Sequence, residues 1–132
     1  MIVVKKECEF DASIDQIWDL MTNLDNQMWR KSVEKIEKIG FHRFIEHDRS
    51  GIQTEFYIVN MIEKEVYEMN LKNDNLEGHW IGKLKERNGK VHLEMIEAIQ
   101  VKKGMMKILA KRYLKHQQKQ YIRDLKNAFN NN

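Results

Sequence analysis

The chain has 132 residues, of which 42% are hydrophobic and 33% are charged. This balance excludes a disordered polypeptide and predicts one globular domain that covers residues 1–132. The single cysteine excludes a disulfide framework and a cysteine metal cluster, and we expect neither a metal nor another cofactor. No apolar run approaches the roughly 20 residues of a membrane helix. No segment resembles a signal peptide, so we expect a cytoplasmic protein without stable membrane insertion.

The formal charge of +3 is unevenly distributed along the chain. Between residues 104 and 129, seven lysine or arginine side chains accompany a single acidic residue, Asp124. A basic face of this kind is typical of a solvated helix surface, and no nucleic-acid motif accompanies it. We therefore expect no nucleic-acid partner, and we leave open an attraction of this face to proteins or anionic lipid.

The spacing of apolar residues predicts one strand, two short helices, six further strands and one long helix, in that order. The first strand is Ile2–Phe10, where side chains alternate between two faces. Ser13 and Gln16 form a capping-box pattern that begins a short helix, and a second short helix is predicted over Asn26–Lys31. The six strands that follow are Val33–Ile39, Phe41–His47, Ile52–Ile62, Glu65–Asn73, Leu76–Glu86 and Val91–Val101.

Two turns predict the register of the hairpins that they connect. A two-residue turn at Asn88-Gly89 places Lys83 opposite Glu94, Leu84 opposite Leu93 and Trp80 opposite Glu97. A turn at Glu63-Lys64 places Phe56 opposite Leu71, Ile58 opposite Met69 and Asn60 opposite Tyr67. Both registers pair apolar side chains with each other and charges with opposite charges, as stable sheets favour. The hairpin between Phe41 and Thr54 allows two turn lengths, and each turns a different face inward.

A long helix is predicted over Lys103–Phe129, and its apolar stripe needs a broad surface to cover. The stripe consists of Met106, Leu109, Ala110, Tyr113, Leu114, Tyr121, Leu125 and Ala128, with Gln117 near its centre. The fold class is therefore α+β with a helix-grip arrangement. A curved antiparallel sheet of about seven strands wraps around the C-terminal helix, and two short helices follow the first strand.

The stretch from Phe10 to Leu20, FDASIDQIWDL, resembles the opening signature of the START/birch-allergen-like (SRPBCC) superfamily. The polyketide cyclase/dehydrase-like branch is the most similar in appearance. Trp29 followed by Val33, and the run Gly78-His79-Trp80-Ile81-Gly82, continue a likeness that covers essentially the whole chain. A proline common in the opening signature and at the fourth-strand turn is missing here. The resemblance implies the helix-grip fold, but the superfamily includes carriers, receptors and enzymes and so leaves the function open.

In such a fold the ligand lies between the sheet and the long helix, in a mostly apolar cavity. The predicted registers and the stripe of the long helix direct ten side chains toward this space: Phe56, Ile58, Asn60, Tyr67, Met69, Trp80, Met95, Glu97, Tyr113 and Gln117. Lys6 on the first strand points the same way. Gln117 either orients a ligand or bonds to a strand or to water. Glu97 is the candidate catalytic residue, because a carboxyl group in an apolar cavity acquires a raised pKa. Alternatively it reaches solvent or pairs with Lys6.

The leading hypothesis is a binding protein for a small hydrophobic molecule that is lipid- or polyketide-like. The alternatives are a cyclase- or dehydratase-type enzyme, in which Glu97 acts with Tyr67 or Tyr113, and a protein or lipid interaction module. The module would use the basic helix face at Lys111, Lys115 and Lys119 or an exposed sheet edge. A homodimer stays open.

Overall fold

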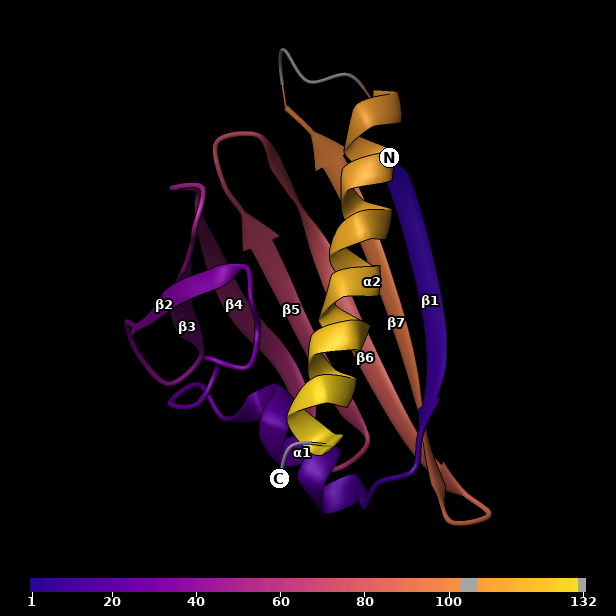
Figure 1. Cartoon of the computed structure of the whole chain (residues 1–132). Helices are drawn as coiled ribbons and strands as arrows, with labels where there is room; N and C mark the ends of the chain where they lie inside the picture. The colour runs from indigo at the N-terminus through magenta and orange to yellow at the C-terminus, as the bar shows by residue number, and fades with distance from the viewer. Residues whose placement is uncertain (103–106, 131–132) are drawn as a thin grey trace.

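The computed structural model describes residues 1–102 and 107–130, and within them the predicted α+β helix-grip fold is confirmed. Seven antiparallel strands form one sheet in the order β1-β7-β6-β5-β4-β3-β2, and the long helix α2 crosses in front of it (Figure 1). The strands are β1 (Ile2–Phe10), β2 (Val33–Lys38), β3 (Arg43–Asp48), β4 (Gln53–Ile62), β5 (Val66–Lys72), β6 (Leu76–Arg87) and β7 (Lys90–Val101). The helices are α1 (Ile14–Thr22) and α2 (Lys107–Asn130). Neither described helix is long and apolar enough to cross a membrane.

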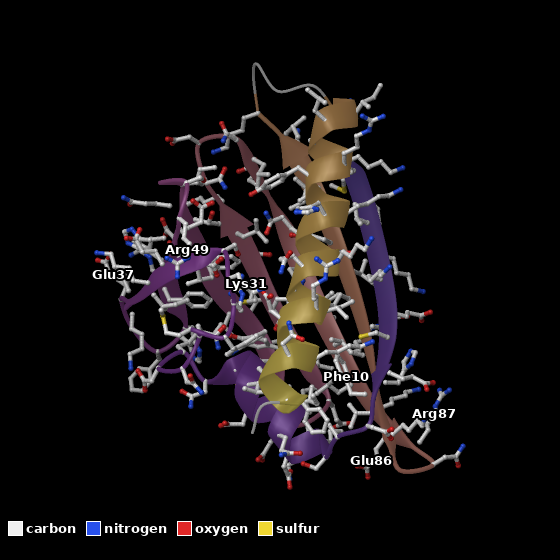
Figure 2. The ribbon with its side chains drawn as sticks, viewed as in Figure 1. Phe10, Lys31, Glu37, Arg49, Glu86 and Arg87 are labelled. Atoms are coloured by element: carbon white, nitrogen blue, oxygen red, sulfur yellow. The ribbon has the colours of Figure 1, made fainter. Side chains whose placement is uncertain are left out.

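The β6–β7 register agrees with the prediction at each of the three pairs given above. Lys83 lies opposite Glu94 and Trp80 lies opposite Glu97, because Asn88 and Gly89 both adopt positive φ angles in a tight turn. Figure 2 shows Glu86 and Arg87 near the end of this hairpin and Phe10 beside the last turns of α2, where Nζ of Lys126 lies 5.9 Å from the centre of its ring. In the hairpin whose turn the sequence left open, Phe44 lies opposite Phe56.

The β4–β5 register agrees only as far as Ile58, which lies opposite Met69. The predicted two-residue turn is wrong, because Ile62 pairs with Val66 and the turn contains Glu63, Lys64 and Glu65. Asn60 therefore lies opposite Glu68 and Met61 lies opposite Tyr67, and a bulge between Ile58 and Asn60 restores the predicted register beyond it. The predicted pairing of Asn60 with Tyr67 is wrong. An extra residue in one strand sends the following side chains to the other face of the sheet.

One short helix follows β1, and the predicted second one is wrong. Helix α1 begins at the predicted capping box, in which the Ser13 side chain accepts a hydrogen bond from the Gln16 backbone. Residues 23–32 form a series of turns instead of a helix. The amide of the buried Gln27 donates to the carbonyl oxygens of Leu20 (3.0 Å) and Asn23 (2.8 Å). These bonds satisfy carbonyl groups at the end of α1 and turn the chain toward β2.

Helix α2 packs most closely on β1 and β7, so its axis lies to one side of the sheet (Figure 1). Its buried side chains include Ala110, Leu114, Gln118, Ile122 and Leu125, a run at intervals of three and four residues. The predicted stripe was rotated from this one, since Leu109 is 55% exposed and Tyr113 is 40% exposed. The start predicted at Lys103 and the stripe residue Met106 lie outside the described residues. The basic side chains Lys111, Lys115 and Lys119 are exposed on the opposite face.

Candidate functional site

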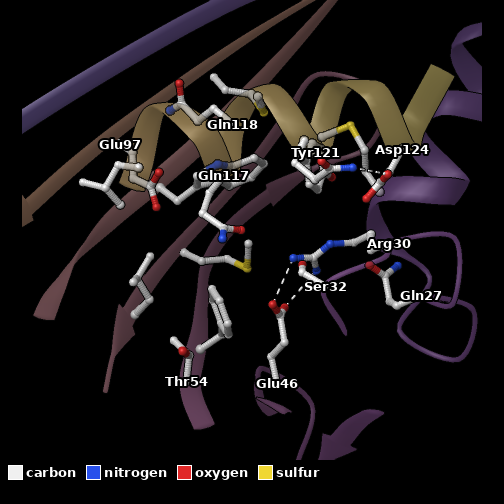
Figure 3. Close-up of a pocket in the computed structure, with 18 of the residues that line it drawn as sticks. Gln27, Arg30, Ser32, Glu46, Thr54, Glu97, Gln117, Gln118, Tyr121 and Asp124 are labelled. Carbon is white, nitrogen blue, oxygen red and sulfur yellow. Dashed lines mark hydrogen bonds and ion pairs between the residues drawn. The ribbon is translucent and has the colours of Figure 1, made fainter. Parts of the chain in front are cut away.

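A cavity of about 150 Å³ lies between the sheet and α2 (Figure 3). It exists because α2 leans on β1 and β7 and leaves space over the middle of the sheet. Apolar and aromatic side chains dominate its lining: Met21, Leu24, Phe44, Phe56, Tyr67, Met69, Leu71, Leu76, Trp80, Met95, Tyr113, Leu114 and Tyr121. The polar and charged side chains include Gln27, Arg30, Ser32, Glu46, Thr54, Asn73, Glu97, Gln117, Gln118, Gln120 and Asp124.

Eight of the ten predicted site residues line this cavity: Phe56, Tyr67, Met69, Trp80, Met95, Glu97, Tyr113 and Gln117. The other two do not. Asn60 is exposed, because the bulge turns it outward, and its amide lies 3.5 Å from the carboxylate of Glu68. Ile58 packs against the hydrophobic core beside the cavity. Lys6 is exposed on the edge strand β1 and lies opposite Met95, outside the cavity lining.

Glu97 is held in the centre of a three-strand segment, opposite Trp80 on β6 and Val4 on β1. The register is continuous on both sides of it, so the alternative of a bulge that releases Glu97 to solvent is not what the structure has. Burial raises the pKa of the carboxyl group to about 7, and a hydrogen bond from Gln118 acts against this rise. The carboxyl group therefore changes its charge near neutral pH.

Tyr113 marks the mouth of the cavity, because it lines the cavity and is still 40% exposed. Its pKa is raised first by burial and then by the negative charges of Asp48, Glu46 and Glu97. Burial accounts for most of this shift, and the smaller part that comes from the three carboxylates indicates a negative potential at the mouth.

Neighbouring glutamines on α2 have different surroundings. Gln117 is partly buried and points into the cavity, with Glu97 and Arg30 on opposite sides of it in Figure 3. Gln118 is only 4% exposed, and its amide donates to the carbonyl oxygen of Val4 over 3.1 Å. The sequence analysis did not single out Gln118. Its position four residues after Leu114 and four before Ile122 was the signal that it belongs to the buried face.

A charged cluster that the sequence did not predict lies at one end of the cavity. Arg30, from the turns after α1, donates two hydrogen bonds to Glu46 on β3, over 2.8 and 2.9 Å. Its guanidinium group lies 5.3 Å from the centre of the Tyr121 ring. Asp124 on α2 is 2% exposed and accepts hydrogen bonds from the backbone N–H of Lys31 (2.9 Å) and from Gln120 (2.8 Å). Only Asp124, the one acidic residue among seven basic ones, was visible as an anomaly in the sequence.

The histidine, cysteine and acidic side chains do not gather into a metal site anywhere in residues 1–102 and 107–130. The buried phenol of Tyr67 has no hydrogen-bond partner in the same part of the chain, and burial raises its pKa to about 12. Its ring packs edge-on against Trp18 and Trp80. Tyr67 therefore presents an unpaired hydroxyl group within the cavity wall.

The fold of this chain is also found in solved structures of low sequence identity. A START superfamily protein from Mycobacterium smegmatis matches with a TM-score of 0.87 and 10% identity, over 98% of this chain and 97% of that one. A conserved protein from Geobacillus kaustophilus matches with a TM-score of 0.85 and 8% identity, over 98% and 96% of the two chains. Ara h 8.0201 matches with a TM-score of 0.78 and 9% identity, over 99% of both chains.

Sequence comparisons add no family beyond this likeness in structure. No protein-family model matches the chain, and no curated protein sequence matches it either. Identities of 8 to 10% establish a shared fold and carry no substrate or activity from one protein to another. The resemblance predicted from the segment after β1 is confirmed at this level, and the chain has the START-like helix-grip fold.

Proposed function

We propose that the chain binds a small hydrophobic molecule in the cavity between the sheet and α2. The observation that carries this proposal is the cavity itself, about 150 Å³ in volume and lined mainly by apolar and aromatic side chains. An apolar cavity of about this size accommodates a molecule such as benzene. A lipid- or polyketide-like ligand therefore places one ring or a short alkyl segment inside, and the remainder extends past Tyr113.

Polar groups in the wall support a defined orientation of the ligand. Gln117 on α2 supplies hydrogen-bond donors and an acceptor, and Glu97 on β7 supplies a carboxyl group from the sheet. A mostly apolar pocket with a few convergent polar groups is the usual design of a small-molecule site. A cytoplasmic location, the absence of nucleic-acid binding and a homodimer remain predictions, and so does a partner for the basic face of α2.

Native mass spectrometry of freshly purified protein tests the proposal, followed by titration with ring-sized neutral compounds such as 2-phenylethanol, monitored by NMR. We expect a non-covalent adduct that is lost on denaturation, or chemical-shift changes confined to the residues that line the cavity. Gln117→Leu and Tyr113→Ala should both weaken binding, and exchange of the exposed Lys115 for Ala should not. Binding that neither cavity variant alters would contradict the assignment of the site.

A second candidate function is proton transfer on a polyketide-like substrate, as in a cyclase or dehydratase. It is favoured by one observation, the Glu97 carboxyl group with a pKa of about 7 inside a cavity. A group with this pKa exchanges a proton readily at neutral pH, and Tyr113 or Tyr67 would supply the second proton donor. Glu97→Gln should abolish the pH dependence of such a reaction. Ligand binding without any conversion of the bound molecule would remove this candidate.

A further inference from the structure

We propose that the cavity is selective for a molecule that joins an apolar body to a positively charged amine, with Glu97 as its counter-ion. This inference rests on the proposed binding function and names the chemical class of its ligand. Four charged side chains line the cavity within the described part of the chain: Arg30, Glu46, Glu97 and Asp124. One guanidinium group is thus accompanied by three carboxyl groups. The formal charge of the lining is −2 when Glu97 is ionised and −1 when it carries a proton.

Arg30, the positively charged side chain of the lining, already forms an ion pair with Glu46. Both terminal nitrogens of Arg30 bond to the two oxygens of Glu46, and the plane of the guanidinium group lies over Tyr121. A carboxylate ligand would have to replace Glu46 in a bidentate pair that is held by the fold. It would also have to enter past Tyr113, whose pKa is raised first by burial and then by the negative charges of Asp48, Glu46 and Glu97. An anionic amphiphile is therefore disfavoured at both ends of the cavity.

Glu97, on the other side of the cavity from Arg30, has a different environment. Glu97 lies directly across from Trp80 on the neighbouring strand, so the carboxyl group and the indole ring occupy the same face of the sheet. An ammonium group placed there bonds to the carboxylate on the sheet face that also carries the indole, the aromatic ring that binds cations best. The remaining apolar and aromatic lining receives the body of the ligand.

Few polar groups lie close enough to Glu97 to compensate its negative charge. It lies opposite the apolar Val4 on β1 and the indole of Trp80 on β6, and from α2 it is approached by the amide of Gln118 and the phenol of Tyr113. Tyr113 keeps its proton in the neutral range, because its pKa is raised. With no basic side chain among these neighbours, burial leaves the carboxyl group with a pKa of about 7. A ligand cation would stabilise the ionised form and release a proton at pH 7.

Isothermal titration calorimetry with three compounds that share a phenylethyl group tests the inference: 2-phenylethylamine, 2-phenylethanol and 3-phenylpropanoate. At pH 8 we expect the amine to bind at least about tenfold more tightly than the alcohol, since a charge-assisted hydrogen bond is worth that much. We expect the carboxylate to bind most weakly. Between pH 6 and pH 8 the affinity for the amine should rise about tenfold, as Glu97 becomes ionised. The affinity for the alcohol should change far less.

Glu97→Gln should remove both the preference for the amine and its pH dependence. Glu94→Gln is the matched control, because Glu94 lies on the same strand, pairs with Lys5 and faces away from the cavity. Titrations of the wild type in two buffers of different ionisation enthalpy measure the proton release directly and need no variant. Equal or tighter binding of the alcohol or the carboxylate overturns the inference but keeps the binding function. Failure of all three compounds to bind contradicts the binding function itself.

Discussion

Arg30 and Glu46 form a bidentate ion pair, at 2.8 and 2.9 Å, that joins the turns after α1 to strand β3. The two side chains are only 18% and 13% exposed. Loss of one partner leaves the other charge buried without compensation. Glu46→Gln should therefore lower the free energy of unfolding by about 3 kcal/mol, as measured by urea denaturation.

The pair between Arg43 and Glu55 provides the matched comparison, since its side chains are 42% and 21% exposed. Glu55→Gln should cost less than about 1 kcal/mol, because solvent screens a pair of this kind. Equal losses for the two variants would show that burial of Arg30 adds nothing to the strength of its pair.

The second prediction concerns the dependence of stability on pH. The pKa of Glu97 is about 7 in the folded chain, against 4.5 for an unperturbed carboxyl group. Between these values the folded state holds a proton that the unfolded state has lost, so stability falls as pH rises from about 4.5 to 7. Glu97→Gln should remove this loss and be more stable than the wild type at pH 8, by up to about 3 kcal/mol. Below pH 4.5 the difference should disappear.

Glu94→Gln serves as the control for this experiment, because hydrogen bonding to Lys5 lowers the pKa of Glu94. Its contribution to stability is present above the unfolded pKa and is lost as pH falls. The two variants should therefore differ from the wild type in opposite directions as pH increases. A pH profile of Glu97→Gln parallel to that of the wild type would contradict the raised pKa.

The third prediction is that the cavity can be filled from α2. Gln117→Trp places a large ring in the space that Gln117 enters, whereas Lys115→Trp adds the same ring to the exposed face of the helix. The first variant should lower the affinity for 2-phenylethanol by at least about tenfold, because the ligand loses its buried contacts. The second should leave the affinity unchanged. Equal affinities of both variants would place the bound ligand elsewhere.

The fourth prediction concerns close packing between β6 and β7. A Cβ atom at Gly78 would lie 2.6 Å from Cδ1 and 2.9 Å from Cα of Ile99, and it would also clash with the carbonyl oxygen of Ala98. Backbone atoms cannot yield without a shift of the strand, so Gly78→Ala should destabilise the fold by about 1–3 kcal/mol. Gly40→Ala is the control, since no atom lies within 4 Å of its added Cβ. Thermal unfolding of the two variants measures the difference.

Local rules were sufficient for most of the sheet. Asn88-Gly89 determines the β6–β7 register because a two-residue turn allows a single pairing, and Trp80 thereby meets Glu97 as predicted. The same rule failed at Glu63-Lys64, where the turn takes in a third residue, Glu65, so that Ile62 pairs with Val66. Lys64 adopts a positive φ angle, which is uncommon for a lysine, so the residue types alone did not indicate the longer turn. The error moved Asn60 from the cavity to the surface.

In the helices, too, the features set by neighbouring residues were predicted correctly and those set by tertiary packing were not. The capping box at Ser13 and Gln16 predicted the start of α1, since its hydrogen bonds are made within four residues. The segment that contains Gln27 was predicted as helix, but the Gln27 side chain bonds to carbonyl groups at the end of α1 and the chain turns instead. For α2, the apolar spacing predicted a helix but not its rotation, which is set by packing on β1 and β7. Gln118 is therefore buried, whereas Tyr113, which the predicted stripe included, is 40% exposed.

The amino-acid sequence by itself determined the order of the strands, the Asn88-Gly89 hairpin turn and the long helix, because these follow from side-chain periodicity and from turn residues close together in the chain. Only the tertiary structure decided what lines the cavity at its charged end. Arg30, Glu46 and Asp124 come from three separate segments, and each is stable in a buried place only because hydrogen-bonding partners are brought to it by the fold. Such partners leave no periodic pattern in the chain, since their spacing is set by how the sheet curves and where α2 rests on it.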